Sequence, residues 1–566
     1  MKVQLEFSLG VDCLNIYVLI TTYNRPEIMV ERAFNSVLNQ TQKPHKVVLV
    51  DNSTTAKIKK MNKENFASAF PNGIYLENQG APNASGTWNT GLDWIKTNDP
   101  HAWVAIIDDD DEWFENHIEI CSKRMDDNDA VLSGIHIIVD GKVTEETIAS
   151  DVSRSDFFAG NPGWQGSNTF ATVSSIIEAG GFDESLLCTN DRDLAVRWLS
   201  MTEKRIGYTG EVTVRYRLET NRECLTMNSG LGKQTGLLQF FNKHRAIMTE
   251  LDVRNFIERA KMFDVHEKWF KISGKNNDYP GFPRSPARIP TGIKRTIHKW
   301  TIDAKKSYWR WRVRPLPTKV FGAQFTRSRE FIEIDITYDC NLHCLGCNRS
   351  CTQAPTKQQM EVEDVENFVK DSLSKGIEWK KIRVLGGEPT EHPNFEKILY
   401  ALGEYKLEFP QTRIELVSNG YGKNVARALV RIPPFIHVEN TAKTSSEGVG
   451  FYAFNAAPID DMKYEKSDFT NGCSNIEDCG IGLGPGGYYP CTLAGGIDRI
   501  MKKNLGRQEL PESDDEMRDL MAEFCKMCGR FQDRKFLPAW YRGQGDPSVQ
   551  SLAWEKAYSQ WRVNNE

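Results

Sequence analysis

The chain has 566 residues, too many for one hydrophobic core, so we expect about two to four domains. Its composition, 40% hydrophobic and 26% charged, is that of an ordinary globular protein, and a net charge of -5 indicates no particular partner. No apolar run approaches the roughly 20 residues of a transmembrane helix, and the first residues lack a signal-peptide pattern, so we expect a cytoplasmic protein without membrane contact.

The first half alternates short apolar runs with a helical stretch. "NIYVLIT" at 15–21 and "KVVLV" at 46–50 have the continuous branched apolar residues of buried parallel strands, and a helix is expected between them near 27–39. A third run, "WVAII" at 103–107, leads into an acidic loop. This order predicts a doubly wound α/β domain whose ligand lies at the carboxyl ends of the strands.

The acidic loop "DDDD" at 108–111 directly follows that third strand. Adjacent carboxylates repel one another, so such a cluster favours a cation, and Mg²⁺ or Mn²⁺ bridging to a diphosphate is one candidate. Taken alone, the four residues are also compatible with a solvated acidic turn.

Several motifs follow in a fixed order: "ITTYNRP" at 20–26, "VVLVDNS" at 47–53, the acidic loop, "GWQGSNTF" at 163–170 and "TNDRDLAVRWL" at 189–199. Together they make residues 14–245 resemble the family 2 glycosyltransferases of the GT-A fold, which are typically inverting enzymes. The resemblance implies a nucleotide-sugar donor bound by Thr22, Asn24, Arg25 and Asp51, and a divalent cation bound by Asp108 and Asp110.

The same resemblance assigns the general base, which takes the proton from the acceptor hydroxyl, to Asp191. This sequence departs from the family pattern one residue earlier, where Asn190 replaces the usual acid. A structural alternative stays open, in which Thr189 or Asn190 caps a helix whose positive end Asp191 stabilises.

A different composition separates the two halves. Residues 274–292 contain four prolines and are expected to form a linker. From Arg284 to Arg329 there are thirteen Lys or Arg residues against one acid, with three tryptophans among them. This basic segment is either a nucleic-acid surface or an amphipathic connector that buries its apolar residues; the second is favoured, with Ile297, Trp300, Ile302 and Trp309 buried.

Regular alternation resumes in the second half. Strands are predicted at 330–338, 381–385, 413–418 and 435–440. Helical stretches are expected between the first of these strands, such as 360–375 between the first and the second. Consecutive β/α units of this kind predict a parallel barrel or partial barrel. The complete fold prediction is therefore α/β, a doubly wound domain followed by a partial barrel with a cysteine-rich extension.

Nine of the thirteen cysteines lie after residue 339, which favours metal ligation over a disulfide framework. "DCNLHCLGCNRSC" at 339–351 gives the spacing Cys-x3-Cys-x2-Cys directly after a predicted strand. A structural zinc site needs two Cys-x2-4-Cys pairs brought together, and a ferredoxin cluster needs four cysteines, often at two-residue spacings. Three thiolates can hold three irons of a [4Fe-4S] cluster and leave the fourth open, which requires Cys351 to stay off the metal.

With "LGGEP" at 385–389 and "VSNG" at 417–420, the cysteine motif resembles the radical S-adenosylmethionine (SAM) superfamily. The resemblance implies a [4Fe-4S] cluster, S-adenosylmethionine, a 5'-deoxyadenosyl radical that abstracts hydrogen, and a reducing partner such as flavodoxin or ferredoxin. Its cluster ligands are Cys340, Cys344 and Cys347, and its S-adenosylmethionine site comprises Gly386, Gly387, Glu388, Pro389, Ser418 and Asn419.

A second cysteine group resembles the auxiliary cluster of the twitch or SPASM kind that follows many radical SAM barrels. The implied ligands of this second [4Fe-4S] cluster are Cys479, Cys491, Cys525 and Cys528. Cys473 is either spare or replaces one of them, and a zinc ribbon is the alternative for the whole group.

The predicted domains are a glycosyltransferase (1–245), a basic linker (246–329), a radical SAM domain (330–460) and an auxiliary cluster domain (461–566). We therefore predict a bifunctional enzyme whose two sites act on the same or successive substrates. The alternatives are a nucleic-acid or nucleoside modifying enzyme whose first domain only binds a nucleotide, and a zinc-containing interaction scaffold.

Overall fold

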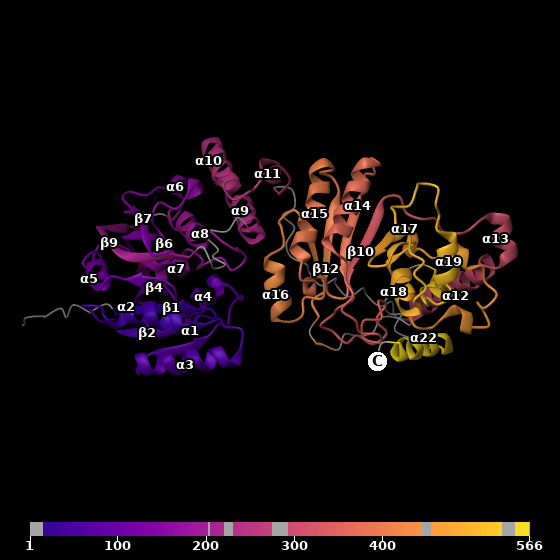
Figure 1. Cartoon of the computed structure of the whole chain (residues 1–566), viewed down its shortest axis with the longest axis horizontal. Coiled ribbons are helices and arrows are strands. Elements are labelled where there is room, and N and C mark those ends of the chain that lie inside the picture. Colours follow the sequence, from indigo (N-terminus) through magenta and orange to yellow (C-terminus); the bar gives the residue numbers. More distant parts are fainter. Residues whose placement is uncertain are drawn as a thin grey trace, which may run out of the picture. The chain divides into compact units, whose positions relative to one another are not determined.

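The computed structural model describes residues 15–201, 204–219, 230–273, 292–443, 445–446, 454–534 and 550–564. The chain divides into two compact units, Met1–Lys271 and Ile272–Glu566 (Figure 1). The predicted proline-rich linker lies outside the described residues except for its last position, Gly292, where a helix begins.

The first unit contains strands and helices in frequent alternation. Its elements are β1 (Ile16–Thr22), α1 (Pro26–Met29), a π-helical turn (Val30–Phe34), α2 (Asn35–Leu38), β2 (Lys46–Asp51), α3 (Ala56–Ala69), β3 (Ile74–Glu77), α4 (Ala84–Asn98), β4 (Trp103–Asp108), β5 (Glu112–Trp113), α5 (His117–Ser122), β6 (Ala130–Val139), β7 (Lys142–Thr147), α6 (Arg154–Ala159), β8 (Thr169–Thr172), α7 (Val173–Glu178), α8 (Asn190–Trp198), β9 (Ile206–Leu218), α9 (Leu231–His244), α10 (Glu250–Lys261) and α11 (Glu267–Ser273).

These strands form one mixed sheet in the order β3-β2-β1-β4-β8-β6-β9-β5, with β7 paired to β6. The first four are parallel, whereas β8 runs antiparallel to β4. Parallel strands joined by helices bring their carboxyl ends to one edge. That edge carries Thr22, Asp51 and Asp108, the last residues of β1, β2 and β4. The predicted α/β class and GT-A-like sheet are confirmed.

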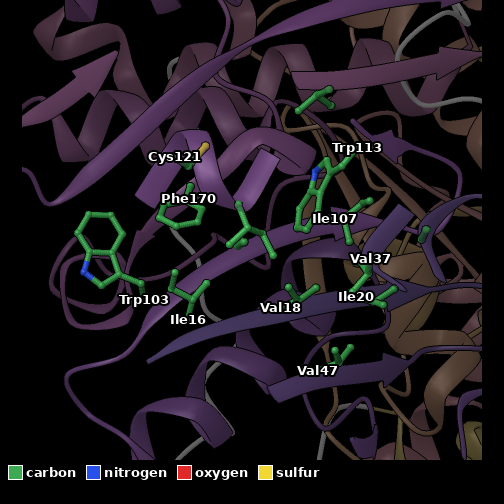
Figure 2. Packing of buried hydrophobic residues seen from close by; sticks show 14 of the residues in the cluster. Ile16, Val18, Ile20, Val37, Val47, Trp103, Ile107, Trp113, Cys121 and Phe170 are labelled. Carbon is green, nitrogen blue, oxygen red and sulfur yellow. The ribbon is translucent and has the colours of Figure 1, made fainter. Parts of the chain in front are cut away.

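One cluster of buried hydrophobic residues packs on one face of the parallel strands (Figure 2). Alternate residues of a strand point to the same face, and Ile16, Val18 and Ile20 of β1 pack there with Ile107 of β4 and Val37 of α2. Both faces of β1 are buried, which explains its continuous apolar sequence.

One ionisable side chain is enclosed in this core. His117 of α5 is fully buried, stacks on Trp113 with ring centroids 4.2 Å apart, and hydrogen-bonds through Nδ1 to Thr213 Oγ1 at 2.7 Å. Its Nε2 has no hydrogen-bond partner among the described residues. Burial lowers the pKa of His117 to about 3, so the folded state holds it neutral.

This burial predicts a loss of stability in mild acid. The unfolded chain takes up the proton below the ordinary histidine pKa and the folded chain does not, so His117 destabilises the fold as the pH falls from about 6.5 toward about 3. Between pH 7 and pH 5 the expected loss is about 2 kcal/mol in the free energy of unfolding. Urea unfolding of the His117→Gln variant should lack this part of the pH dependence. His101→Gln, at an exposed position, should keep it; equal slopes for wild type and His117→Gln would contradict the assignment.

The second unit begins with two helices and continues with β/α units. Its elements are α12 (Gly292–Arg312), α13 (Pro315–Phe321), β10 (Phe331–Thr337), α14 (Val362–Ser374), β11 (Lys381–Gly386), α15 (Phe395–Glu408), β12 (Arg413–Ser418), α16 (Lys423–Val430), β13 (His437–Asn440), α17 (Asn475–Asp478), β14 (Ile481–Gly484), β15 (Gly487–Tyr489), α18 (Thr492–Met501), α19 (Arg518–Phe524), α20 (Arg530–Asp533) and α22 (Leu552–Val563).

Strands β10 to β13 are parallel neighbours in chain order, with α14, α15 and α16 in their connections. This confirms the predicted partial barrel. The cysteine-rich residues extend the same sheet: β14 pairs parallel with β10, and β15 pairs antiparallel with β14. The sequence did not indicate this extension, because β14 reads "IGLG" and two of its four residues are glycine.

The basic segment forms α12 and α13, and its expected burial is only half right. Ile302 and Trp309 are 5% and 7% exposed, whereas Ile297 and Trp300 are 60% and 78% exposed. Helical periodicity explains the difference, since Ile302 and Trp309 lie on one side of α12, and Ile297 and Trp300 lie on the opposite side.

Within the described ranges, no helix has the length and apolar character needed to cross a membrane.

Candidate active sites

The acidic loop after β4 is held by hydrogen bonds from the neighbouring strand. Asp108 Oδ1 accepts from Thr21 Oγ1 at 2.9 Å and from Trp88 Nε1 at 3.2 Å. Asp109 Oδ2 accepts from Thr22 Oγ1 at 2.8 Å and from the backbone N–H of Tyr23 at 3.1 Å. The end of β1 thus fixes the start of the acidic loop.

Arg25 supplies the positive charge of this loop. Its guanidinium donates to Asp109 Oδ1 at 3.0 Å and to Asp110 Oδ2. Burial, followed by the neighbouring charge of Asp110, raises the pKa of Asp108 to about 7, although the hydrogen bonds from Thr21 and Trp88 lower it. Burial likewise raises the pKa of Asp109 to about 6. Burial and the neighbouring charge of Asp110 therefore both disfavour ionisation of these two carboxyl groups.

The other predicted nucleotide-binding residues lie between β1 and β2. Asn24 adopts a left-handed backbone (φ 56°), donates its N–H to Ser53 Oγ at 3.0 Å and accepts from the Thr54 N–H at 2.9 Å. Asp51 is fully buried and accepts three hydrogen bonds. Its donors are Ser53 N (2.7 Å), Asn62 Nδ2 (2.9 Å) and Tyr75 OH (2.8 Å). Nothing in the sequence indicated Asn62 or Tyr75.

Asp191 lies in the first turn of α8, partly buried. Its Oδ2 accepts from Asn161 Nδ2 at 2.7 Å, and burial raises its pKa. The segment that begins at Asn161 also contacts the acidic loop, because a Cβ on Gly166 would lie 3.1 Å from Asp108 Oδ2. One segment therefore contacts both Asp191 and the acidic loop.

The predicted helix caps before Asp191 have other roles. Thr189 is the residue before α8 but its side chain caps nothing, and Asn190 donates to Ser85 Oγ and to the carbonyl of Leu186 at 3.1 Å. Asn190 is therefore a packing residue within the fold.

In the second unit, the predicted site residues meet at the carboxyl ends of β10, β11 and β12. The backbone N–H of Gly387 donates to Thr337 O at 2.8 Å, and that of Glu388 donates to Asp339 O at 2.9 Å. A Cβ on Gly386 would lie 2.3 Å from Thr337 O, and one on Gly387 would lie 2.0 Å from Asp339 O. Only glycine permits this approach to the chain that leads into Cys340.

Glu388 connects the ends of β11 and β12. It is fully buried; its Oε1 accepts from Ser418 Oγ at 2.9 Å and Thr390 Oγ1 at 2.7 Å, and its Oε2 accepts from the Asn419 N–H at 2.7 Å. Asn419 Nδ2 donates to Asn341 Oδ1 at 2.7 Å. Asn341, which follows Cys340 directly, was missed by the sequence prediction, and it ties the third strand end to the cysteine loop.

The cysteines of that loop differ in environment. Burial raises the pKa of Cys340 to about 12, and the charges of Cys347 and Cys344 add to this. A hydrogen bond from Cys351 lowers the pKa of Cys347 to about 6. Cys351 thus lies beside Cys347 and donates its S–H to that sulfur.

The second cysteine group surrounds a cavity. Cys473, Cys491, Cys525 and Cys528 line it together with apolar residues such as Ile476 and Phe524. Cys479 does not line it, and the charges that act most strongly on Cys479 are those of Glu333 and Arg383 in the barrel strands. Across the described ranges, no group of three or more His, Cys, Asp or Glu side chains is arranged to hold a metal ion.

Comparison with protein families matches two separate parts of the chain. Residues 17–177 match the model of glycosyl transferase family 2, and residues 334–451 match the model of the radical SAM superfamily.

Curated relatives resemble a short part of the chain. A GTP 3',8-cyclase of Aliarcobacter butzleri is 28% identical over 99 residues, which cover 17% of this chain and 29% of that enzyme. The GTP 3',8-cyclase of Chlorobaculum tepidum is 34% identical over 81 residues, covering 14% of this chain and 23% of that enzyme. The chain thus spans less than a third of the length of these relatives.

Among solved structures, TarS of S. aureus is 14% identical and covers 47% of this chain and 48% of TarS, with a TM-score of 0.33. A structure of its residues 1–349 with UDP-GlcNAc is 15% identical and covers 46% of this chain and 84% of that one, with a TM-score of 0.30.

Proposed function

We propose that this chain, which combines a glycosyltransferase family 2 domain with a radical SAM enzyme domain, catalyses two reactions. The first is transfer of a sugar from a nucleotide-sugar to an acceptor hydroxyl, with inversion at the anomeric carbon. The second is hydrogen abstraction by a 5'-deoxyadenosyl radical from the same or a successive substrate. The observation that carries the proposal is the convergence of three barrel strand ends on the cysteine loop.

In the first reaction, the nucleotide binds at the ends of β1 and β2. Thr22, Asn24 and Arg25 lie at this edge and offer hydroxyl, amide and guanidinium groups to the base, ribose and diphosphate. Asp51 has both carboxylate oxygens occupied by hydrogen bonds from its own domain, so its proposed role is to position this edge.

Asp108 and Asp110 are the proposed ligands of Mg²⁺ or Mn²⁺. The residues fit such an ion, because it prefers oxygen ligands, and the charge of Asp110 adds to the burial that raises the pKa of Asp108. When bound, the cation neutralises the diphosphate leaving group. Arg25 pairs with Asp110 in this structure, and its guanidinium would suit the diphosphate if a cation held Asp110.

Asp191 is the proposed general base. Asn161 orients its carboxylate. Burial raises the pKa of Asp191, which makes it a stronger base toward the acceptor hydroxyl. The remaining oxygen, Oδ1, accepts the backbone N–H of Arg192 at 2.8 Å, which holds the side chain at the start of α8.

In the second reaction, Cys340, Cys344 and Cys347 are the proposed ligands of a [4Fe-4S] cluster. Their loop fits three-thiolate ligation, since the hydrogen bond from Cys351 already stabilises Cys347 as a thiolate. Once assembled, the cluster supplies the electron that cleaves S-adenosylmethionine, received from a partner such as flavodoxin or ferredoxin.

The strand ends around this loop are the proposed S-adenosylmethionine site. Gly386 and Gly387 let the chain pack against the backbone at Thr337 and Asp339, beside Cys340, and Pro389 begins a short helical turn after Glu388. Glu388 holds Ser418 and Asn419 in place, and Asn419 fixes the loop through Asn341. The site is therefore positioned before any ligand binds.

A second [4Fe-4S] cluster is proposed for the cysteine-lined cavity. Four thiols with raised pKa values, two of them buried and two partly buried, are costly to ionise without a metal. Arg534, 1% exposed, lies near Cys473 and Cys525 and offsets the negative charge of thiolates. The cavity supports Cys473, Cys491, Cys525 and Cys528 as ligands, whereas the sequence prediction has Cys479 in the place of Cys473.

Iron content distinguishes the two ligand sets. Anaerobically reconstituted protein should contain about eight irons, four for each cluster. The Cys473→Ser variant is expected to lose up to about four of them because one thiolate is missing, and Cys479→Ser should keep about eight. The reverse result would restore the sequence prediction, and zinc in place of iron would favour a zinc ribbon.

The proposal as a whole is tested by separating the two activities in one preparation. Nucleoside diphosphate release from nucleotide-sugars reports the first site, and 5'-deoxyadenosine release reports the second. We expect a variant at either site to lose one activity and keep the other.

A further inference from the structure

The exposed side of α12 and α13 carries an apolar stripe that the proposed reactions do not use. Ile297, Trp300, Tyr308 and Trp311 are 60%, 78%, 55% and 51% exposed. Their spacing of three, eight and three residues places them along one side of a helix with 3.6 residues per turn. The opposite side, with Ile302 and Trp309, packs into the unit. α12 is therefore apolar on two sides, and only one of them is covered.

The stripe continues onto α13. Trp311 and Phe321 have ring centroids 6.2 Å apart, and Tyr308 and Trp311 are 5.9 Å apart. Leu316, Val320 and Phe321 of α13 are 73%, 66% and 62% exposed. Large side chains clustered in this way usually mark a surface that contacts a partner.

Cations flank the stripe. At 100° per residue, Lys299 and Lys305 lie on opposite sides of it, and Arg314 and Lys319 lie along its continuation. All four are exposed, and no ion-pair partner for them occurs in the described part of the chain. Residues 292–321 contain nine Lys or Arg and one acid, Asp303. The surface thus combines exposed tryptophans and aliphatic side chains with an excess of basic over acidic residues.

We propose that this surface lies on the headgroup region of an anionic phospholipid bilayer. Apolar side chains on one side of a helix with lysines beside them suit that boundary, where the rings and aliphatic groups enter the acyl region and the amines meet phosphates. A single-stranded nucleic acid fits less well, because Ile297, Leu316 and Val320 offer bases no stacking surface. The contact is peripheral, and it differs from the absence of membrane contact expected from the sequence.

Vesicle co-sedimentation of the full chain tests the proposal. We expect binding to vesicles of phosphatidylcholine with phosphatidylglycerol, weak binding to phosphatidylcholine alone, and weakening by salt. The Trp300→Ala, Trp311→Ala double variant should bind at least about tenfold more weakly, because two large side chains no longer enter the bilayer. Lys299→Glu with Lys305→Glu should also weaken binding about tenfold or more.

Matched controls come from exposed positions elsewhere. Met262→Ala, at a side chain 75% exposed, and Lys60→Glu on α3 should leave vesicle binding unchanged. Unchanged 5'-deoxyadenosine release would show that the stripe variants are folded. The proposal is overturned if the protein ignores anionic vesicles, or if the stripe variants bind them as wild type does. It is also overturned if the stripe variants keep vesicle binding and lose affinity for a single-stranded oligonucleotide, or if they lose only the ability to form a concentration-dependent dimer.

Discussion

The Cys344→Ala variant is expected to release no measurable 5'-deoxyadenosine, at least about a thousandfold less than wild type, when reduced by dithionite in the presence of S-adenosylmethionine. Three thiolates are the minimum for a cluster with one open iron, and Cys344 is the middle one. Removing it leaves two ligands, so the iron of this cluster should be lost as well. Nucleoside diphosphate release by the first unit should stay within about twofold of wild type.

Cys351→Ala is the matched control for this result. Cys351 is four residues from Cys347, the same spacing as between Cys340 and Cys344, but it acts on that sulfur by hydrogen bonding. We expect this variant to retain its iron and to lose less than about tenfold in 5'-deoxyadenosine release, since one hydrogen bond to a thiolate is removed. If Cys351→Ala lost as much iron as Cys344→Ala, the loop would hold its cluster with four thiolates and the radical assignment would fail.

The Asp191→Asn variant is expected to lower nucleoside diphosphate release from a panel of nucleotide-sugars with Mn²⁺ by about 10² to 10⁴. Asparagine keeps the shape and can still accept the hydrogen bond from Asn161, so the loss reflects the missing base. In wild type, activity should rise with pH through the raised pKa of Asp191, because only the ionised carboxylate takes a proton. The variant should lack this limb of the pH profile.

The alternative role of Asp191 gives a different result. If its charge only stabilises the start of α8, Asp191→Asn costs about 0.3 to 1 kcal/mol of stability and leaves the rate unchanged. Asp183→Asn serves as the control, because Asp183 is a nearby acid that pairs with Lys243 outside the proposed site. Equal rates for the two variants would favour a first unit that only binds the nucleotide.

The strands and the proposed sites were predictable from the sequence because each motif follows an apolar strand. β1, β2, β4 and β10 to β12 begin and end within two residues of their predicted bounds, and parallel topology then brings their ends together. This was enough to place Thr22, Asp51 and Asp108 at the strand ends of the first unit, and Gly386 and Glu388 at the end of β11.

Side-chain partners beyond the motifs were not predictable. Asn62 and Tyr75 reach Asp51 from a helix and a strand that carry no motif, and Asn341 has no signal except its place after Cys340. Whether Cys473 or Cys479 is the proposed cluster ligand depends on how β14 pairs with β10. The sequence "IGLG" does not predict that pairing. The exposure of Trp300 depends on which side of α12 the unit covers, and periodicity cannot decide this when both sides are apolar.

The hydrogen bonds of Glu388 have a consequence for attempts to move this chemistry between proteins. The cysteine loop is held through Asn341 and Asn419, and Asn419 is held by Glu388. Glu388 follows β11, the strand beside β10, and accepts hydrogen bonds from Ser418 and Asn419 at the end of β12. The two glycines before Glu388 touch the backbone at Thr337 and Asp339. A graft of residues 339–351 alone onto another barrel would therefore transfer the ligands without their supports. The smallest portable unit is the set of three strand ends, which must be exchanged together.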